Sequence, residues 1–401
     1  MQKFTLPVSI KKLSFLLLWS VLLLNSCKDD SPVKPGEEEN KYLDESSVIT
    51  ELTREQVAQK ASALNPLLAA YVKNGIKVYK ITYKTKNTDG TDITASGALI
   101  LPVTDQPASL ISIQHGTIRD DASAPSNFND GSEGASFGSL FSSMGYIIAY
   151  PDYIGYGASK DLPHPYEHRA SLASSCLDML RAAKEFLKDQ NAVKWDEKLY
   201  VAGYSEGGYA TMSLQKKIEE EAASEFNLRA SSCGAGAYDK TAFMKYIINT
   251  PTTGVASYNS LYLWVLLTYD RIYKLNKPTS YYFKEPFATQ ITASGINVRI
   301  NQSFDSILND SFKKALNDGT DTGFVNAIGD NDVYNWKPKT PTRLFHGDED
   351  NLVFYFNSKK AYDTMKALGA NVELTTIPKG DHGSSITTFL IGTQAFFTST
   401  K

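Results

Sequence analysis

The feature that most constrains this chain is a serine between glycines, at a point where an apolar strand pattern changes to a helical one. The segment reads Val201-Ala202-Gly203-Tyr204-Ser205-Glu206-Gly207-Gly208. A serine on such a turn needs glycines two positions before and after it, because a Cβ there would collide with the adjoining strand or helix. The turn leaves the serine hydroxyl clear at the carboxyl edge of a sheet, so the segment predicts a nucleophile at Ser205.

Strand and helix patterns alternate on both sides of this segment. Two β-rich runs, 78–85 and 93–101, flank Asn87-Thr88-Asp89-Gly90, which predicts an antiparallel hairpin. Further strands are expected at 110–114, 146–150, 198–204, 230–237, 342–345 and 372–377, and helices at 171–187, 209–218, 354–368 and 386–397. The alternation predicts a mostly parallel α/β sheet with helices on both faces and with ligand sites at the carboxyl ends of the strands.

Residues 239–339 interrupt this alternation with helical stretches rich in aromatic side chains. These include Tyr262, Trp264, Tyr269, Tyr273, Tyr281, Tyr282 and Phe283. An excursion of this kind above the carboxyl edge of a sheet is typical of a lid or cap. The plainer interpretation is a helical domain whose aromatic side chains form its own core, and most of these side chains fit it. The predicted α/β core then comprises residues 42–238 and 340–401.

The first residues have the pattern of an export signal. Lysines precede an apolar run at 13–24, which is too short for a stable membrane span. The run ends in Leu24-Asn25-Ser26-Cys27, which resembles the lipobox of bacterial lipoproteins. By that resemblance residues 1–26 are a signal peptide and Cys27 is the lipidated first residue of the mature chain. The alternative is an ordinary cleaved signal that happens to retain a cysteine.

Residues 27–41 contain prolines and a run of glutamates, a composition that predicts a flexible tether. The tether begins with Lys28-Asp29-Asp30, which resembles the acidic signal that sends some lipoproteins to the outer face of the outer membrane. The plainer interpretation is a solvated charge run. We therefore expect an outer-membrane lipoprotein, exposed at the cell surface if the acidic signal operates, or otherwise a secreted or periplasmic protein.

Composition narrows the range of partners. The formal net charge is −3, and no basic patch or nucleic-acid-binding motif occurs, so no nucleic acid partner is expected. The chain has no P-loop, dinucleotide fingerprint or metal-binding cluster, and we expect neither a cofactor nor a metal.

Besides Cys27 the cysteines are Cys176 and Cys233, which fall in apolar segments and favour two unpaired core thiols over a disulfide. The expected state is a monomer.

A nucleophilic serine needs a histidine to accept its proton and a carboxylate to orient that histidine. The chain has five histidines. His115 lies in a His-Gly turn after an early strand, His164 and His168 share a loop, and His346 ends a strand. His382 follows the last predicted strand, the place of the base in this strand order, so we expect it to be the base. The alternative is a surface-loop histidine.

The acid is expected after the next-to-last strand, where the chain offers three carboxylates, Asp348, Glu349 and Asp350. Asp381 adjoins the histidine in sequence, and adjacent residues seldom aim their side chains at each other. The residues alone therefore restrict the acid to one loop.

Two N–H groups should stabilise the negative oxygen of a tetrahedral intermediate. One is expected from the backbone of Glu206, which follows the nucleophile at the start of a helix. The second should come from the turn after the early strand, His115-Gly116-Thr117. His115 itself fits a structural role, with its ring bonded to backbone.

With these elements in order, the chain resembles an α/β-hydrolase and, more narrowly, the secretory lipase family of fungi and bacteria. The narrower likeness rests on Pro151-Asp152-Tyr153-Ile154-Gly155-Tyr156-Gly157-Ala158-Ser159, His164-Pro165-Tyr166 and Gly203-Tyr204-Ser205-Glu206-Gly207-Gly208. The family segment His-Gly-x-x-Asp-x-x-Val places its acid at Asp350. The family's oxyanion loop implies that the Thr117 N–H is a donor and Gly116 a spacer, or a donor one residue away.

The resemblance implies an α/β-hydrolase fold and hydrolysis of carboxylic esters under a lid, with an acyl-enzyme intermediate on Ser205. Family members often carry Gln where Glu206 stands, and the lid offers no similarity from which to infer the acyl chain. One alternative is a peptidase of the same fold, in which Glu206 grips a substrate amino terminus. Another is an esterase that removes acetyl or feruloyl groups from polysaccharides, with the aromatic lid as a sugar-stacking wall. The complete serine, acid and histidine set argues against a glycan-capture protein that only binds.

Overall fold

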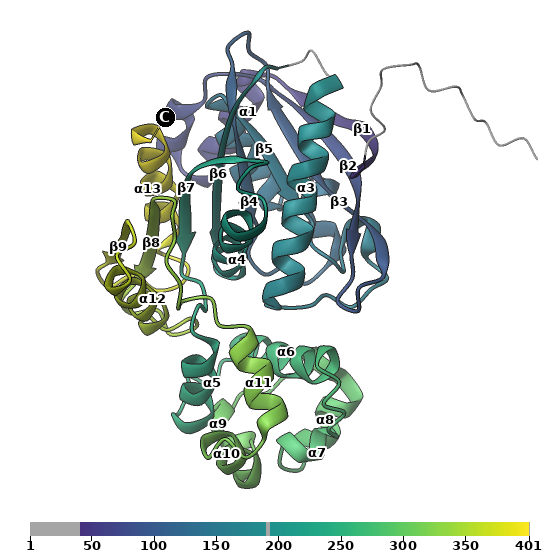
Figure 1. Ribbon diagram of the computed structural model, residues 1–401, viewed down its shortest axis with the longest axis vertical. Coiled ribbons are helices and arrows are strands. Elements are labelled where there is room, and N and C mark those ends of the chain that lie inside the picture. Colours follow the sequence, from purple (N-terminus) through teal and green to yellow (C-terminus); the bar gives the residue numbers. More distant parts are fainter. Residues whose placement is uncertain (1–40, 190–192, 401) are drawn as a thin grey trace, which may run out of the picture. The chain divides into compact units, whose positions relative to one another are not determined.

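One nine-stranded sheet runs through the described part of the chain, residues 41–189 and 193–400 of the computed structural model (Figure 1). Its strands lie in the order β1-β2-β3-β5-β4-β6-β7-β8-β9. Their bounds are β1 (Leu43–Leu52), β2 (Ile76–Lys86), β3 (Asp92–Pro102), β4 (Ala108–Gln114), β5 (Tyr146–Pro151), β6 (Trp195–Tyr204), β7 (Asn227–Gly234), β8 (Thr342–Gly347) and β9 (Val372–Ile377). The predicted signal peptide, the lipidated Cys27 and nearly all of the tether lie outside the described residues.

The sheet is parallel from β5 to β9 and antiparallel at its other edge. β1, β2, β3 and β5 pair antiparallel in turn, whereas β5, β4, β6, β7, β8 and β9 pair parallel. The predicted hairpin is β2 and β3, joined at Gly90, whose φ of 85° suits a residue without a Cβ. The expectation of a mostly parallel α/β sheet is confirmed.

Strand β1 is not expected from the sequence. Most residues of this strand face solvent, so its sequence lacks the alternation of apolar and polar residues that marks a half-buried strand. Backbone pairing with β2 holds it instead. The Glu185 carboxylate adds three hydrogen bonds, from the N–H groups of Lys41 at 3.1 Å, Tyr42 at 2.9 Å and Leu43 at 2.7 Å.

Helices cover both faces of the sheet, because successive residues of a strand point to opposite sides. On β6, Leu199 and Val201 join one hydrophobic cluster with residues of α3 and α4, while Tyr200 and Ala202 join another with residues of α1, α2 and α13. Figure 1 shows α3 and α4 in front of the sheet. The bounds are α1 (Arg54–Leu64), α2 (Ser139–Ser143), α3 (Arg169–Asp189), α4 (Glu206–Glu221), α12 (Phe356–Ala367) and α13 (Ile386–Ser399).

The segment between β7 and β8 forms a helical insertion with its own core. Its helices are α5 (Lys240–Asn249), α6 (Ala256–Ile272), α7 (Thr279–Tyr282), α8 (Phe287–Ser294), α9 (Phe304–Ile307), α10 (Asp310–Asn317) and α11 (Thr322–Asp330). Tyr262, Tyr269, Tyr282 and Phe283 are at most 5% exposed and pack in a third hydrophobic cluster, so the interpretation of these aromatic side chains as core is confirmed. That cluster also contains Leu352 and other residues of the α/β part, which ties the insertion to the sheet.

Two further observations bear on the described residues. Cys176 and Cys233 are buried free thiols, as expected. In the described ranges, every helix is too short or too polar to qualify as a membrane span.

The approach of α4 to β7 leads to a stability prediction. A Cβ at Gly208 would lie 2.1 Å from the Gly234 carbonyl oxygen, whereas one at Gly329 in α11 would meet nothing within 4 Å. We expect Gly208→Ala to lower the free energy of unfolding by about 1–3 kcal/mol through overpacking. Gly329→Ala, the matched control, should raise it by about 0.4–1 kcal/mol. Urea unfolding measures both, and equal effects of the two substitutions would contradict the packing argument.

Candidate active site

The turn at Ser205 joins β6 to α4 with a strained backbone. β6 ends at Tyr204 and α4 begins at Glu206, and Ser205 between them has φ 61° and ψ −125°. A Cβ at Gly203 would lie 2.3 Å from the Gly207 carbonyl oxygen, and one at Gly207 would lie 2.0 Å from the Gln114 carbonyl oxygen. The absence of these two side chains lets α4 start directly above β4, so the serine hydroxyl stands at the carboxyl edge of the sheet.

His382 lies beside this serine. Its Nε2 is 2.8 Å from Ser205 Oγ, although the two residues are 177 positions apart in sequence. The loop between β9 and α13 carries the histidine back over the turn, and the Tyr204 hydroxyl donates a hydrogen bond to the His382 carbonyl oxygen at 2.8 Å. The residue before the nucleophile therefore anchors the backbone of the histidine.

Asp350 lies on the other side of the imidazole. Its Oδ2 is 2.7 Å from His382 Nδ1, and its Oδ1 accepts the N–H groups of Leu352 and Val353 at 3.0 Å each. The carboxylate fixes the tautomer, because Nδ1–H donates to it and leaves Nε2 free to accept the serine proton. Of the three carboxylates in this loop, only Asp350 is buried; Asp348 and Glu349 are exposed.

The surroundings keep Asp350 ionised. Burial raises the pKa of its carboxyl, but hydrogen bonds from His346 and His382 and the attraction of their charges outweigh burial, so the pKa lies well below its usual range. His346 is itself fully buried, with Nε2 at 2.6 Å from the Val353 carbonyl oxygen and 3.3 Å from Asp350 Oδ2. From the sequence, His346 has no expected role beyond ending its strand, and only the folded loop places it on the carboxylate.

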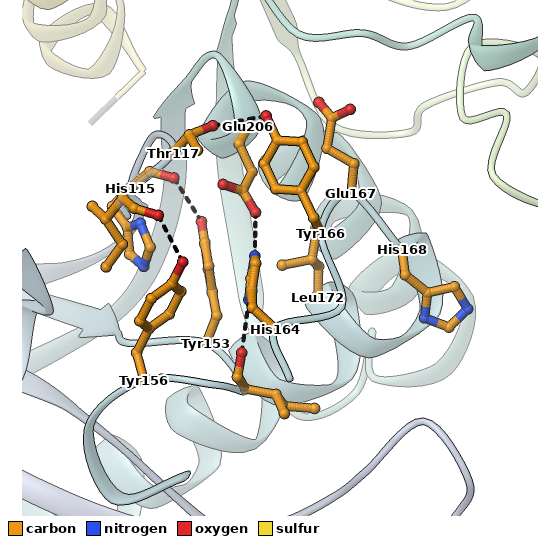
Figure 2. Close-up of polar contacts among 12 residues, drawn as sticks. His115, Thr117, Tyr153, Tyr156, His164, Tyr166, Glu167, His168, Leu172 and Glu206 are labelled. Carbon is orange, nitrogen blue, oxygen red and sulfur yellow. Dashed lines mark hydrogen bonds and ion pairs between the residues drawn. The ribbon is translucent and has the colours of Figure 1, made fainter. Parts of the chain in front are cut away.

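The two expected oxyanion donors lie on either side of the serine. Glu206 is the first residue of α4, and its N–H, like that of Thr117, makes no hydrogen bond within the described parts of the chain. The Gly116 N–H is occupied, since it donates to Glu133 Oε1 at 3.1 Å. The Thr117 side chain is held by the Tyr166 hydroxyl, 2.8 Å from its Oγ1 (Figure 2). Thr117 rather than Gly116 thus offers a free donor.

The Glu206 side chain is buried and is directed towards His164 (Figure 2). His164 Nε2 lies 2.8 Å from Glu206 Oε1, and His164 Nδ1 lies 2.7 Å from the Ile154 carbonyl oxygen. The imidazole thus bridges the Glu206 carboxylate and the backbone of Ile154. The carboxylate next to Ser205 is therefore held by His164.

His115 has the expected structural place. Its ring nitrogens lie 2.7 Å and 3.1 Å from the carbonyl oxygens of Gly116 and Asp152, and its ring stacks on Tyr153 with centroids 4.0 Å apart. The Tyr153 hydroxyl donates to the His115 carbonyl oxygen at 3.0 Å (Figure 2). These contacts fix the turn that carries Thr117.

Two largely apolar cavities meet at the serine. The insertion cavity is narrow, with a volume of about 30 Å³, and is lined by Ser205, by α5 and α6, and by Glu167 and Lys240. The sheet cavity, of about 270 Å³, is lined by Ser205, Thr117 and His382 and by side chains of β4, β6 and α13. A substrate with two apolar parts can therefore extend in two directions from Ser205.

Comparisons with known proteins identify a family and several similar folds. The model of the family described as secretory lipase matches residues 136–390. A proposed hydrolase from Legionella pneumophila is 24% identical over 90% of this chain and 98% of its own, with a TM-score of 0.81. The rice cell wall degrading esterase LipA from Xanthomonas oryzae is 23% identical over 91% of this chain and 100% of its own, with a TM-score of 0.76.

A more distant structure has the same fold. Lipase A from Candida antarctica in its closed state is 15% identical over 88% of this chain and 82% of its own, with a TM-score of 0.61. A search of curated proteins finds no match. The structural neighbours establish the α/β-hydrolase fold, as expected from the sequence.

The lowered pKa of Asp350 predicts a pH dependence of stability. Its folded-state pKa lies below the unfolded value of about 3.9, so the stabilisation is complete above that pH and is lost as the pH falls towards the folded value. We expect the free energy of unfolding of wild type to exceed that of Asp350→Asn by on the order of 2 kcal/mol at pH 7. This difference should become smaller at pH 3. Urea unfolding at pH 7, 5 and 3 measures it. A difference that stays constant over this range would contradict the prediction.

Proposed function

This chain belongs to the secretory lipase family, and from that premise we propose that it hydrolyses carboxylic esters with Ser205 as nucleophile, His382 as general base and Asp350 as the acid that orients the histidine. The family and the fold make it a lipase- or esterase-type hydrolase. The observation that carries the proposed roles is the unbroken hydrogen-bond chain from Ser205 Oγ through the imidazole to the buried carboxylate.

In the proposed reaction Ser205 Oγ attacks the ester carbonyl carbon while its proton passes to His382 Nε2. The carbonyl oxygen becomes negative and accepts hydrogen bonds from the backbone N–H groups of Thr117 and Glu206, each of which is worth about 10²–10³ in rate. Collapse of the intermediate expels the alcohol, which takes the proton from His382. Water, activated by the same histidine, then cleaves the acyl–Ser205 ester and regenerates the hydroxyl.

The helical insertion is proposed to be the lid of this site. The Tyr262 hydroxyl donates to the Leu352 carbonyl oxygen at 3.0 Å, two residues after Asp350, so α6 is bonded to the loop of the acid. In support of this, apolar side chains of α5 and α6 line the insertion cavity together with Ser205. The segment proposed as a lid, 239–339, therefore both covers the nucleophile and shapes the space beside it.

The peptidase alternative loses its main support in this geometry. A carboxylate that grips a substrate amino terminus must be accessible, but Glu206 is 2% exposed and its oxygen is engaged by His164. We therefore propose an esterase rather than a peptidase.

An esterase acting on polysaccharides remains the second candidate, because the fold matches that of the rice cell wall degrading esterase LipA. The proposed sugar-stacking wall has less support, since most of the insertion aromatic side chains are buried in its core. Release of acetate or ferulate from xylan, without activity on long-chain esters, would select this candidate.

The proposed triad is tested with nitrophenyl esters of increasing chain length and a fluorophosphonate probe. We expect Ser205→Ala to abolish labelling and to lower kcat about 10⁶-fold, and Asp350→Asn to lower it about 10⁴-fold. Glu349→Gln is the matched control in the same loop, and its exposed side chain should leave kcat unchanged. If wild type neither labels nor turns over any ester, or if Asp350→Asn behaves like Glu349→Gln, the proposed roles are wrong. Turnover of aminoacyl anilides above that of esters would restore the peptidase.

Family membership indicates a secreted protein. We further propose that residues 1–26 are removed and that Cys27 carries a lipid that attaches the protein to the outer membrane, with 27–41 as a tether. We expect Cys27→Ser to release the protein from membranes, because a single polar side chain gives no attachment once the acyl chains are missing. Membrane fractionation measures the change, with Cys176→Ser as control. Continued membrane association of Cys27→Ser would exclude the anchor.

A further inference from the structure

A buried ion pair lies in the wall of the insertion cavity, beside the nucleophile. Lys240 Nζ forms an ion pair with Glu167 Oε2, and the two side chains are only 3% and 7% exposed. Both residues line the cavity together with Ser205, while the rest of the lining is largely apolar. Glu167 comes from the loop before α3 and Lys240 from the first turn of α5, so the pair joins the α/β part to the insertion.

Stability does not explain this pair. Burial raises the pKa of Glu167 and lowers the pKa of Lys240, and the attraction between the two charges opposes both shifts. Replacing such a pair by apolar side chains of similar volume is often neutral or stabilising, since the desolvation of two charges is so costly. Paired ionisable groups in a cavity next to a nucleophile are more typical of a functional site.

The pair leaves one acceptor unused. Glu167 Oε2 accepts a hydrogen bond from Lys240 Nζ, but Glu167 Oε1 has no hydrogen-bond partner among the described residues. Glu167 Oε1 is not fully enclosed by protein atoms, so part of its surface is open to the cavity. Figure 2 shows the carboxylate directed away from the His164–Glu206 pair. A buried acceptor of this kind is costly unless a donor fills it.

The backbone holds this carboxylate in place. Glu167 has φ 51°, in the left-handed region that is rare for a residue with a side chain. The Tyr269 hydroxyl of α6 donates to its carbonyl oxygen at 3.0 Å. Strained backbone that is held by surrounding contacts is concentrated at functional sites.

The charge of the pair decides what it can bind. Lys240 neutralises Glu167, and its Nζ also lies 4.3 Å from the centroid of the Tyr209 ring. A neutral pair neither attracts a free cation or anion strongly nor opposes the negative oxygen that forms at the serine. A neutral hydroxyl suits it, since a hydroxyl donates to Oε1 and can accept from the ammonium group.

The position of the histidine decides which part of the ester reaches the pair. The leaving oxygen must take its proton from His382, which lines the sheet cavity and not the insertion cavity. The alcohol part is thus assigned to the sheet cavity and the acyl part to the insertion cavity.

Resting on the proposed ester hydrolysis, we propose that the Glu167–Lys240 pair is a specificity site for a hydroxyl group on the acyl part, and that the preferred substrates are esters of hydroxy acids. The pair acts on substrate binding and not on bond making. A hydrogen bond to a charged acceptor that is otherwise left unpaired favours the hydroxylated acyl chain by about tenfold to a hundredfold in kcat/KM.

The test compares nitrophenyl esters of ω-hydroxyalkanoic acids with those of the parent alkanoic acids over a series of chain lengths. The measured quantity is the ratio of kcat/KM with the hydroxyl to kcat/KM without it. Wild type should reach a ratio of about ten or more at one chain length. Glu167→Gln should lower that ratio, and the double variant Glu167→Leu with Lys240→Met, which removes both charges at similar volume, should bring it below one. Met244→Leu, a change in the apolar lining, is the control and should keep the wild-type ratio.

The outcomes separate this inference from the proposed function. A wild-type ratio at or below one at every chain length overturns the inference, even though turnover of the parent esters supports the triad. Failure of wild type to turn over either series overturns the proposed function itself. If the charge variants lower kcat/KM equally for both series and leave the ratio unchanged, the pair is only a structural link between the insertion and the sheet. The wild-type ratio and Glu167→Gln decide the question even if the double variant does not fold.

Discussion

The close approach of α4 to the backbone of β4 and β7 is the contact on which the rest of the site depends. A single residue, Ser205, separates the end of β6 from the start of α4. Gly203, Gly207 and Gly208 all lie where a Cβ would be within 2.3 Å of a backbone oxygen. Because the turn is so tight, Ser205 has a positive φ and its hydroxyl projects from the sheet edge. The same geometry puts the Glu206 N–H at a helix start, where a negative oxygen is stabilised.

Each buried carboxylate around the serine has a side-chain partner. Asp350 faces His346 and His382, Glu206 faces His164, and Glu167 forms an ion pair with Lys240. In a low-dielectric site an uncompensated carboxylate would oppose the developing oxyanion, since charges interact more strongly there than in water. These partners leave the backbone N–H groups of Thr117 and Glu206 as the proposed stabilisers of the transition state, and the Glu167–Lys240 pair as the proposed polar specificity site in an otherwise apolar cavity.

Much of the fold was predictable because local patterns and the strand order agree. The strands at the centre of the sheet are apolar runs with clear turns, and each expected strand from 110 onward overlaps an observed one. Strand β1 was not predicted, because an exposed edge strand is held by backbone pairing, which leaves no apolar pattern in its sequence. The contact between Glu206 and His164 was not predicted for a different reason. The two residues are 42 positions apart, so no local sequence pattern indicates their contact.

The sequence by itself determined the nucleophile turn, the order of serine, acid loop and histidine, and the family, because these are written in short local motifs. The family resemblance had already pointed to Asp350 among three neighbouring carboxylates. Only the tertiary structure decided that His346 lies on the Asp350 carboxylate, that the Gly116 N–H is already used, and that the Glu206 side chain is held by His164. These outcomes depend on which side chains from distant segments share a buried space. Burial makes such pairings strong and selective, and a linear sequence does not record them.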